Sequence, residues 1–114
     1  MKLKLIATLF ATSAIALLSA TSASAAPDAA SAEALAKKSG CTKCHAVDKS
    51  KKGPSYKKIA AKWKGKTDAE AKLIDNITKA PKVKFEDGTE EEHKVVDSKD
   101  QKEIKNLVQW VLAQ

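Results

Sequence analysis

The stretch that most constrains this chain is Cys41-Thr42-Lys43-Cys44-His45, in which two thiols stand three positions apart and an imidazole directly follows the second. This spacing is typical of c-type haem attachment. The thiols can add to the two vinyl groups of a porphyrin, and the histidine can then bind the iron from below, because neutral imidazole is a good donor to iron. The motif therefore predicts one covalent haem c, bonded to Cys41 and Cys44, with His45 as proximal ligand.

Two cysteines at this spacing also suit other sites. A structural zinc site would need two more Cys or His ligands nearby, and the only other histidine is His93. A strained disulfide or a thioredoxin-like redox pair is a further alternative. The redox pair would need strands before the motif and a helix starting within it, whereas residues 29–38 are typical of a helix that runs into the motif. Haem attachment is the favoured interpretation.

The first 25 residues follow the order of a secretory signal. Lys2 and Lys4 precede an apolar run at residues 5–18, and a tract of small residues ends in Ala23-Ser24-Ala25. A retained anchor is the alternative, but these 14 residues are fewer than the roughly 20 that span a bilayer. We expect cleavage after Ala25, which leaves residues 26–114 as one small periplasmic domain without a membrane span.

The positive charge of this chain comes from lysine alone. All 21 basic residues are lysines, against 14 acids, so the chain without Lys2 and Lys4 carries a net charge of +5. The densest stretch, residues 37–66, flanks the haem motif and suits loose docking of a partner with an acidic face. A merely solvated surface is the alternative. Nucleic acid is a poor candidate, because the chain shows neither a recognition motif nor a series of stacking aromatics.

The first two predicted helices lie on either side of the motif. Asp28 marks the start of an alanine-rich helix at residues 29–39, and Gly40 closes it. Ser55 is expected to cap a second, short helix that ends before Gly65. Its apolar residues recur at the helical spacing i, i+3, i+4 and i+7, and they are Tyr56, Ile59, Ala60 and Trp63.

Two further helices are predicted from capping boxes. Thr67 with Glu70 marks one that ends before Pro81, and Ser98 with Gln101 marks the last, which is the most amphipathic of the domain. Between them, residues 81–97 are rich in charge and contain an Asp87-Gly88 turn, which indicates a loop with room for a small hairpin. The pattern predicts an all-α fold of four or so short helices.

In this order, the elements resemble a small single-haem class I cytochrome c of bacteria. The Gly53-Pro54-Ser55-Tyr56 segment and a last helix with Leu107 and Trp110 carry the resemblance beyond the haem motif. It implies helices wrapped around one covalent haem and an electron carrier rather than an enzyme. It further implies that the Pro54 carbonyl accepts a hydrogen bond from His45. Trp63 and Trp110 would line or back the haem, core packing being the alternative for both.

The chain departs from this family at the sixth iron ligand, which is normally a methionine before the last helix. Its only methionine is Met1, which leaves with the signal. His93 stands where that methionine would fall, and we predict it as the distal ligand. An open or water-bound site, Lys94, another lysine or Asn76 are the alternatives.

Two imidazole ligands would lower the reduction potential relative to a methionine-ligated protein, because thioether stabilises ferrous iron. An open or displaceable distal position would instead suit gas binding or peroxidase-like chemistry. The sequence favours the electron carrier.

Overall fold

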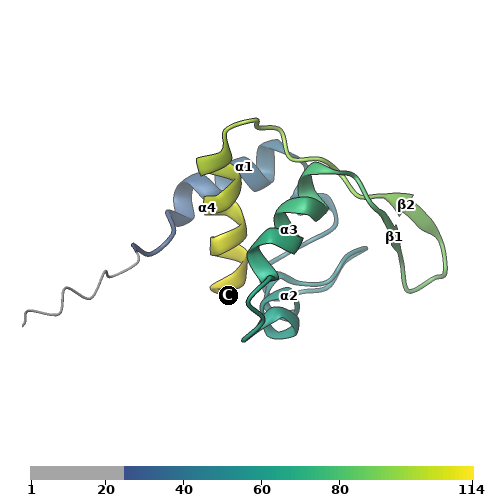
Figure 1. The fold of residues 1–114 in the computed structure, drawn as a ribbon. Helices are drawn as coiled ribbons and strands as arrows, with labels where there is room; N and C mark the ends of the chain where they lie inside the picture. The colour runs from purple at the N-terminus through teal and green to yellow at the C-terminus, as the bar shows by residue number, and fades with distance from the viewer. Residues whose placement is uncertain (1–24) are drawn as a thin grey trace, which may run out of the picture.

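The computed structural model describes residues 25–114, so the expected signal peptide lies outside the described residues except for Ala25. Four helices and one small hairpin make up this domain (Figure 1). In chain order they are α1 (Ala29–Lys38), a 3-10 turn (Cys41–Lys43), α2 (Tyr56–Trp63), α3 (Ala69–Thr78), β1 (Lys82–Lys84), β2 (Glu90–Glu92) and α4 (Gln101–Leu112). None of the described helices combines the length and apolar character needed to cross a membrane.

Helix α4 is the centre of the packing and contacts α1, α2 and α3. Its inward face repeats at helical spacing through Ile104, Leu107, Val108 and Val111, and Ile104 is only 2% exposed. On α1, the buried residues Ala32 and Ala36 are small, which lets the two helices approach closely. The core therefore lies along α4. The haem motif follows α1 directly, and α1 packs against α4.

The caps of α1 and α2 are those predicted. The Asp28 carboxylate accepts a hydrogen bond from the backbone N–H of Ser31 at 3.1 Å, and the Ser55 hydroxyl accepts one from Lys58 at 3.2 Å. Glycines end both helices, with Gly40 at φ 74° and Gly65 at φ 75°, a left-handed conformation that favours glycine.

Both predicted capping boxes are wrong. Helix α3 starts after Asp68 without a side-chain cap, and the N–H of its first residue, Ala69, donates to the carbonyl of Lys66. Helix α4 starts after Asp100, whose carboxylate accepts the N–H of Lys102 at 2.8 Å. Ser98 instead donates its hydroxyl proton to Glu103 and accepts the N–H of Asp100.

Strands β1 and β2 form an antiparallel hairpin that extends away from the helices (Figure 1). Lysines of β1 face glutamates of β2 in the pairs Lys82–Glu92 and Lys84–Glu90, a favourable cross-strand arrangement. The predicted turn is confirmed, with Gly88 at φ 86°. At the base of the hairpin, the N–H of His93 donates to the carbonyl of Pro81 at 2.8 Å.

Candidate haem site

Cys41 and Cys44 lie on one turn at the end of α1. The left-handed Gly40 redirects the chain into the 3-10 turn, and the N–H of His45 then donates to the carbonyl of Cys41 at 2.9 Å. Both cysteines are half-buried free thiols. Burial raises the pKa of the Cys41 thiol, with a smaller effect of Cys44 in the same direction. A thioredoxin-like nucleophile requires a lowered pKa, and the shift of Cys41 is in the opposite direction.

His45 is oriented by the loop that follows it. Its Nδ1 lies 2.5 Å from the carbonyl oxygen of Pro54. Because a carbonyl can only accept, Nδ1 carries the proton and donates, which leaves the lone pair on Nε2 free for a metal. Burial is the largest influence on the pKa of His45 and lowers it, and His93 lowers it further against the opposing effect of the Pro54 contact. The ring is thereby held neutral, as a ligand must be.

Gly53 makes room for this ring. Its N–H donates to the carbonyl of Cys44 at 2.8 Å, which folds the loop back over the motif. A Cβ at position 53 would lie 2.6 Å from Cε1 of His45, closer than side-chain carbons approach. The Gly-Pro pair therefore has two separate tasks, since Gly53 leaves space for the imidazole and Pro54 orients it.

The ring of His93 lies close to the ring of His45, although 48 positions separate the two residues in the sequence. The centroids of the two rings are 6.2 Å apart and their planes are inclined by 40°. Two imidazoles on opposite sides of one metal, each with a metal–nitrogen bond of about 2 Å, would have centroids about 6 Å apart. Nδ1 of His93 is 2.9 Å from the carbonyl oxygen of Lys94, so the same reasoning leaves its Nε2 free. The centroid separation is close to the value expected for two imidazoles bound to one metal, and both rings keep Nε2 free.

The alternative distal ligands are placed differently. Nζ of Lys94 lies against Gly40, 3.3 Å from where a Cβ on that glycine would be. Asn76 is half-buried on α3. In residues 25–114, no cluster of three or more His, Cys, Asp or Glu side chains is arranged to hold a metal ion.

The hydroxyl of Tyr56 is buried and has no hydrogen-bond partner among the described residues. Its ring stacks on His45 at a centroid distance of 5.7 Å and meets the edge of Trp110 at 5.2 Å. Burial raises the pKa of Tyr56 to about 12, so the hydroxyl remains a donor. A buried donor without a partner indicates a polar group supplied from outside these residues. Two free thiols, two facing imidazoles and this hydroxyl together fit a haem, whose carboxylates could accept the proton.

The two tryptophans lie in different surroundings. Trp110 is 7% exposed and belongs to the core, as the packing alternative predicted. Trp63 is half-buried and lines a hollow of about 550 Å³ between α2, the start of α3 and the end of α4. Nζ of Lys66 lies 5.1 Å from its ring centroid and Nζ of Lys62 5.9 Å. A contact between Trp63 and the haem stays a prediction.

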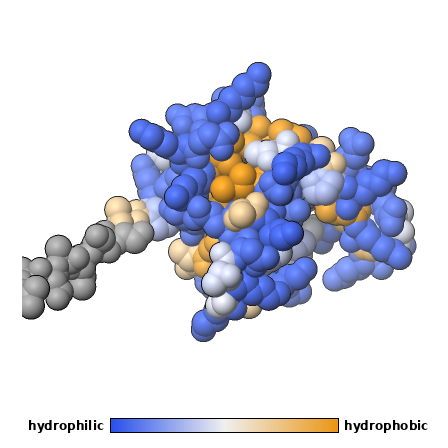
Figure 2. Space-filling model, in the orientation of Figure 1, coloured by the Kyte–Doolittle hydropathy of each residue, from blue (hydrophilic) through white to orange (hydrophobic). Residues whose placement is uncertain are grey.

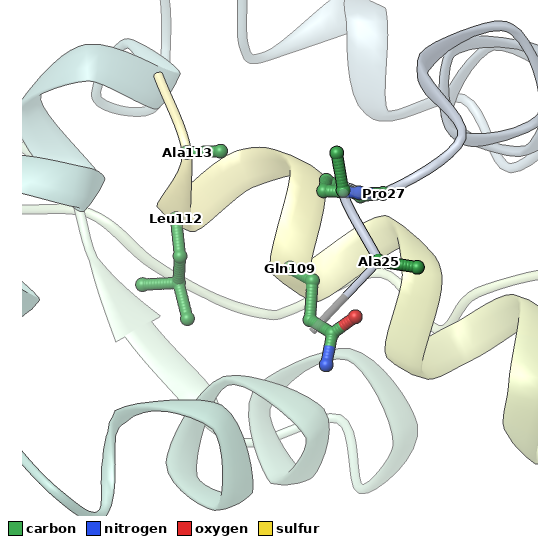
Figure 3. A pocket seen from close by; sticks show the side chains of 6 residues that line it. Ala25, Pro27, Gln109, Leu112 and Ala113 are labelled. Carbon is green, nitrogen blue, oxygen red and sulfur yellow. The ribbon is translucent and has the colours of Figure 1, made fainter. Parts of the chain in front are cut away.

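A second hollow, which the sequence did not suggest, separates the start of the described chain from the end of α4 (Figure 3). This second hollow is lined by Ala25, Ala26, Pro27, Gln109, Leu112 and Ala113. Neither hollow includes the cysteines or histidines of the site.

The profile of the family described as cytochrome c matches residues 29–114. The chain belongs to the cytochrome c family. This cytochrome c is 37% identical to cytochrome c-551 of Pseudomonas aeruginosa over 82 residues, which is 72% of this chain and 75% of that protein. It is 35% identical to cytochrome c-552 of Hydrogenobacter thermophilus over 81 residues, or 71% of this chain and 79% of that protein.

Two solved structures also resemble this cytochrome c. The class 1 cytochrome MtoD of Sideroxydans lithotrophicus ES-1 is 55% identical with a TM-score of 0.74, over 77% of this chain and 97% of that one. Wild-type cytochrome c552 of Nitrosomonas europaea is 34% identical with a TM-score of 0.56, over 70% and 95%. The prediction of a small, helical, single-haem class I cytochrome c with one covalent haem c is confirmed, and such proteins are electron carriers rather than enzymes.

Two residues of the site were not singled out from the sequence. Tyr56 was expected only as part of an apolar helix face, and its stacking on His45 follows from the loop that turns back at Gly53. Lys52 was one lysine among many, yet its Nζ lies 2.5 Å from Oε1 of Glu91 in β2. Only the opposite charges of the two segments hinted at this contact.

Proposed function

We propose that this cytochrome c is a periplasmic electron carrier whose haem iron is bound by two histidines, His45 and His93. The observation that carries the proposal is the 6.2 Å separation of the two rings. The Nδ1 contacts with the carbonyls of Pro54 and Lys94 support it, because they leave both Nε2 lone pairs available.

Each residue of the site would have a distinct task. Cys41 and Cys44 would form the thioether bonds, and Pro54 would hold His45 in one orientation and one tautomer. The bound haem supplies a one-electron couple at its iron. Because both imidazoles are held by backbone contacts, they would stay in place in both oxidation states, which keeps structural reorganisation small during electron transfer.

The ligand pair would also set the reduction potential. A methionine is absent from residues 26–114, so no methionine sulfur within them can bind the iron and stabilise the ferrous state. The glutamates of β2 directly precede His93, and their negative charge would favour ferric iron as well. We therefore expect a potential below that of methionine-ligated relatives.

Docking of an acidic partner would use the lysines of residues 37–66. Hydrophilic side chains cover most of the face shown in Figure 2, around a smaller hydrophobic area. Lysine without arginine suits brief encounters, because its strongly hydrated charge attracts a partner without fixing a bidentate geometry. The periplasmic location rests on the secretory pattern at residues 1–25.

The distal ligand can be tested with ferric optical and EPR spectra of the haem-loaded protein. We expect low-spin bis-imidazole spectra for the wild type and a high-spin spectrum for His93→Ala, which should then bind cyanide and, once reduced, carbon monoxide readily. Lys94→Ala is the matched control and should resemble the wild type. A His93→Ala variant that keeps the wild-type spectrum would exclude His93, and a high-spin wild type would favour the gas-binding or peroxidase-like alternative.

A gain-of-ligand variant tests the potential. His93→Met should raise the midpoint potential, because it replaces the stronger σ donor by a thioether. Redox titration of wild type, His93→Met and Lys94→Met would check this, and equal shifts in both variants would count against a role specific to position 93. The mass of the protein purified from a periplasmic extract would test cleavage after Ala25.

A further inference from the structure

The strand that precedes His93, β2, makes few contacts with the helices of the domain. Strands β1 and β2 pair through only three residues each, and all three residues of β2 are exposed. Backbone hydrogen bonds fix the base of the hairpin, from His93 to Pro81 and from Val96 to Ile77, each at 2.8 Å. Both bonds lie at the base, so a contact farther along β2 would help to hold this strand toward the loop of residues 46–54 that follows the haem motif, here called the proximal loop.

Lys52 makes that contact. Its Nζ lies 2.5 Å from Oε1 of Glu91 and 4.6 Å from the ring centroid of Phe85, so it reaches both arms of the hairpin. Of the ion pairs among the described residues, this one joins the hairpin to the loop that follows the haem motif. The lysine and the glutamate are about half exposed, at 45% and 56% of their side chains.

Hydrogen bonds connect the backbone around Lys52 to the haem motif that carries His45. Its neighbour Gly53 is bonded to the carbonyl of Cys44, and Lys51 donates its N–H to the carbonyl of Gly53 at 2.9 Å. Nζ of Lys51 also donates to the carbonyl of Thr42 at 2.7 Å. Lys52 therefore projects from a loop whose position relative to His45 is fixed.

Glu91 stands two residues before His93. Alternate residues of an extended chain point to the same side, so the carboxylate and the imidazole both face the proximal loop. The contact from Lys52 to Glu91 thus lies two residues from His93 along the strand.

We propose that Lys52 is a positioning residue that holds His93 opposite His45 by clamping β2 to the proximal loop. This inference rests on the proposed ligation by His93. Lys52 does not touch the iron in this arrangement, and its effect is to slow the release of the distal imidazole. An exposed ion pair and a cation–ring contact are each modest, so Lys52→Gln should speed that release about fivefold.

Cyanide binding to the ferric haem-loaded protein measures the release, because cyanide can bind only after the distal imidazole has left. Lys52→Gln removes a positive charge and would by charge alone slow an anion, so faster binding reports on the clamp. Lys52→Arg should restore the wild-type rate, since a guanidinium can pair with Glu91 and stack on Phe85. Lys57→Gln is the matched control. Lys57 lies on α2, and it pairs with Asp48 of the proximal loop and not with the hairpin.

A double-variant cycle completes the test. Glu91→Gln should also accelerate cyanide binding. The double variant with Lys52→Gln and Glu91→Gln should show a smaller acceleration than the two single effects combined. Equal cyanide-binding rates for Lys52→Gln and Lys57→Gln would overturn the clamp, and so would strictly additive effects of Lys52→Gln and Glu91→Gln. The ligation by His93 would still stand in either case, provided that His93→Ala is high-spin. If His93→Ala keeps the wild-type spectrum, the ligation fails and the clamp fails with it.

Discussion

At the scale of single residues, the site depends on two backbone carbonyls and on a glycine, Gly53, which has no side chain. Pro54 and Lys94 supply carbonyls that select the tautomer of each histidine. Gly53 leaves the space in which the His45 ring lies. These are constraints on shape and protonation, and the chemistry of the ligands follows from them.

The space at Gly53 leads to a direct prediction. Gly53→Ala should displace the His45 ring, because the added Cβ would lie 2.6 Å from Cε1 and about 3 Å from both ring nitrogens. We expect a loss of roughly 1–3 kcal/mol in the free energy of unfolding, typical of overpacking, together with a changed ferric spectrum. Thermal unfolding and optical spectra of the haem-loaded protein would measure both.

The control for this variant is Gly65→Ala. A Cβ at Gly65 meets nothing within 4 Å, although the residue's φ of 75° makes alanine strained there. Gly65→Ala should therefore lower the unfolding temperature without changing the spectrum. An unaltered spectrum in Gly53→Ala would show that the proximal ring can relax away from the new methyl group.

At the scale of elements, a carboxylate or hydroxyl that accepts a backbone N–H marks the start of α1, α2 and α4, whereas α3 has no side-chain cap. For α4 this is Asp100 and not Ser98. Asp100→Ala should cost about 1 kcal/mol of folding stability, whereas Ser98→Ala should cost clearly less, because Ser98 supports the cap from outside the helix. Chemical denaturation of both variants would decide the order, and the reverse ranking would restore Ser98 as the functional cap.

The cap of α1 gives a dependence on pH. The side chain of Ser31, followed by its backbone N–H, lowers the pKa of Asp28 below 3.8. A carboxyl with a depressed folded pKa contributes stability above its unfolded pKa and loses it as the pH falls through the folded value. The difference in unfolding temperature between wild type and Asp28→Asn should thus be present at neutral pH and shrink below about pH 3.8.

Ser31→Ala offers a graded comparison for this cap. It removes the hydroxyl that donates to Oδ2 of Asp28 at 2.7 Å but keeps the backbone donor. Its pH profile should therefore lie between those of the wild type and Asp28→Asn. Parallel profiles for all three proteins would mean that α1 does not draw stability from the ionised carboxylate.

The elements show how far sequence reasoning reaches. Gly40 and Gly65 marked helix ends that the structure confirms, because glycine in a left-handed conformation is a local signal. Ser98 and Asp100 are equally good caps by type, but in the structure Ser98 bonds Glu103 while Asp100 accepts the N–H of the helix. The contact of Lys52 with Glu91 joins residues 39 positions apart in a chain rich in both charges, so no local pattern could select it.

At the scale of the whole molecule, charge is distributed unevenly. Lysines dominate residues 37–66, whereas five carboxylates gather in and beside the hairpin, at Glu86, Asp87, Glu90, Glu91 and Glu92. The excess of lysine over acid makes the domain a cation at neutral pH. Long-range attraction toward anionic partners follows from that sign, and salt should screen it.

Small redox probes of opposite charge would test this field without a biological partner. Oxidation of the ferrous protein by ferricyanide should slow as ionic strength rises, and oxidation by a cationic cobalt tris-phenanthroline complex should accelerate. Stopped-flow rates over a series of salt concentrations would measure both. The same trend for the two probes would show that net charge does not govern encounters at the electron-transfer site.

The hydrogen bond from the N–H of His93 to the carbonyl of Pro81 closes the base of the hairpin and so tethers the proposed distal ligand through its backbone. A tethered ligand acts as though it were present at about millimolar effective concentration. Any small molecule arriving from solution would have to compete with this internal rival. With His93 as the proposed ligand, a dilute gas or peroxide should lose that competition, which would favour the exchange of electrons.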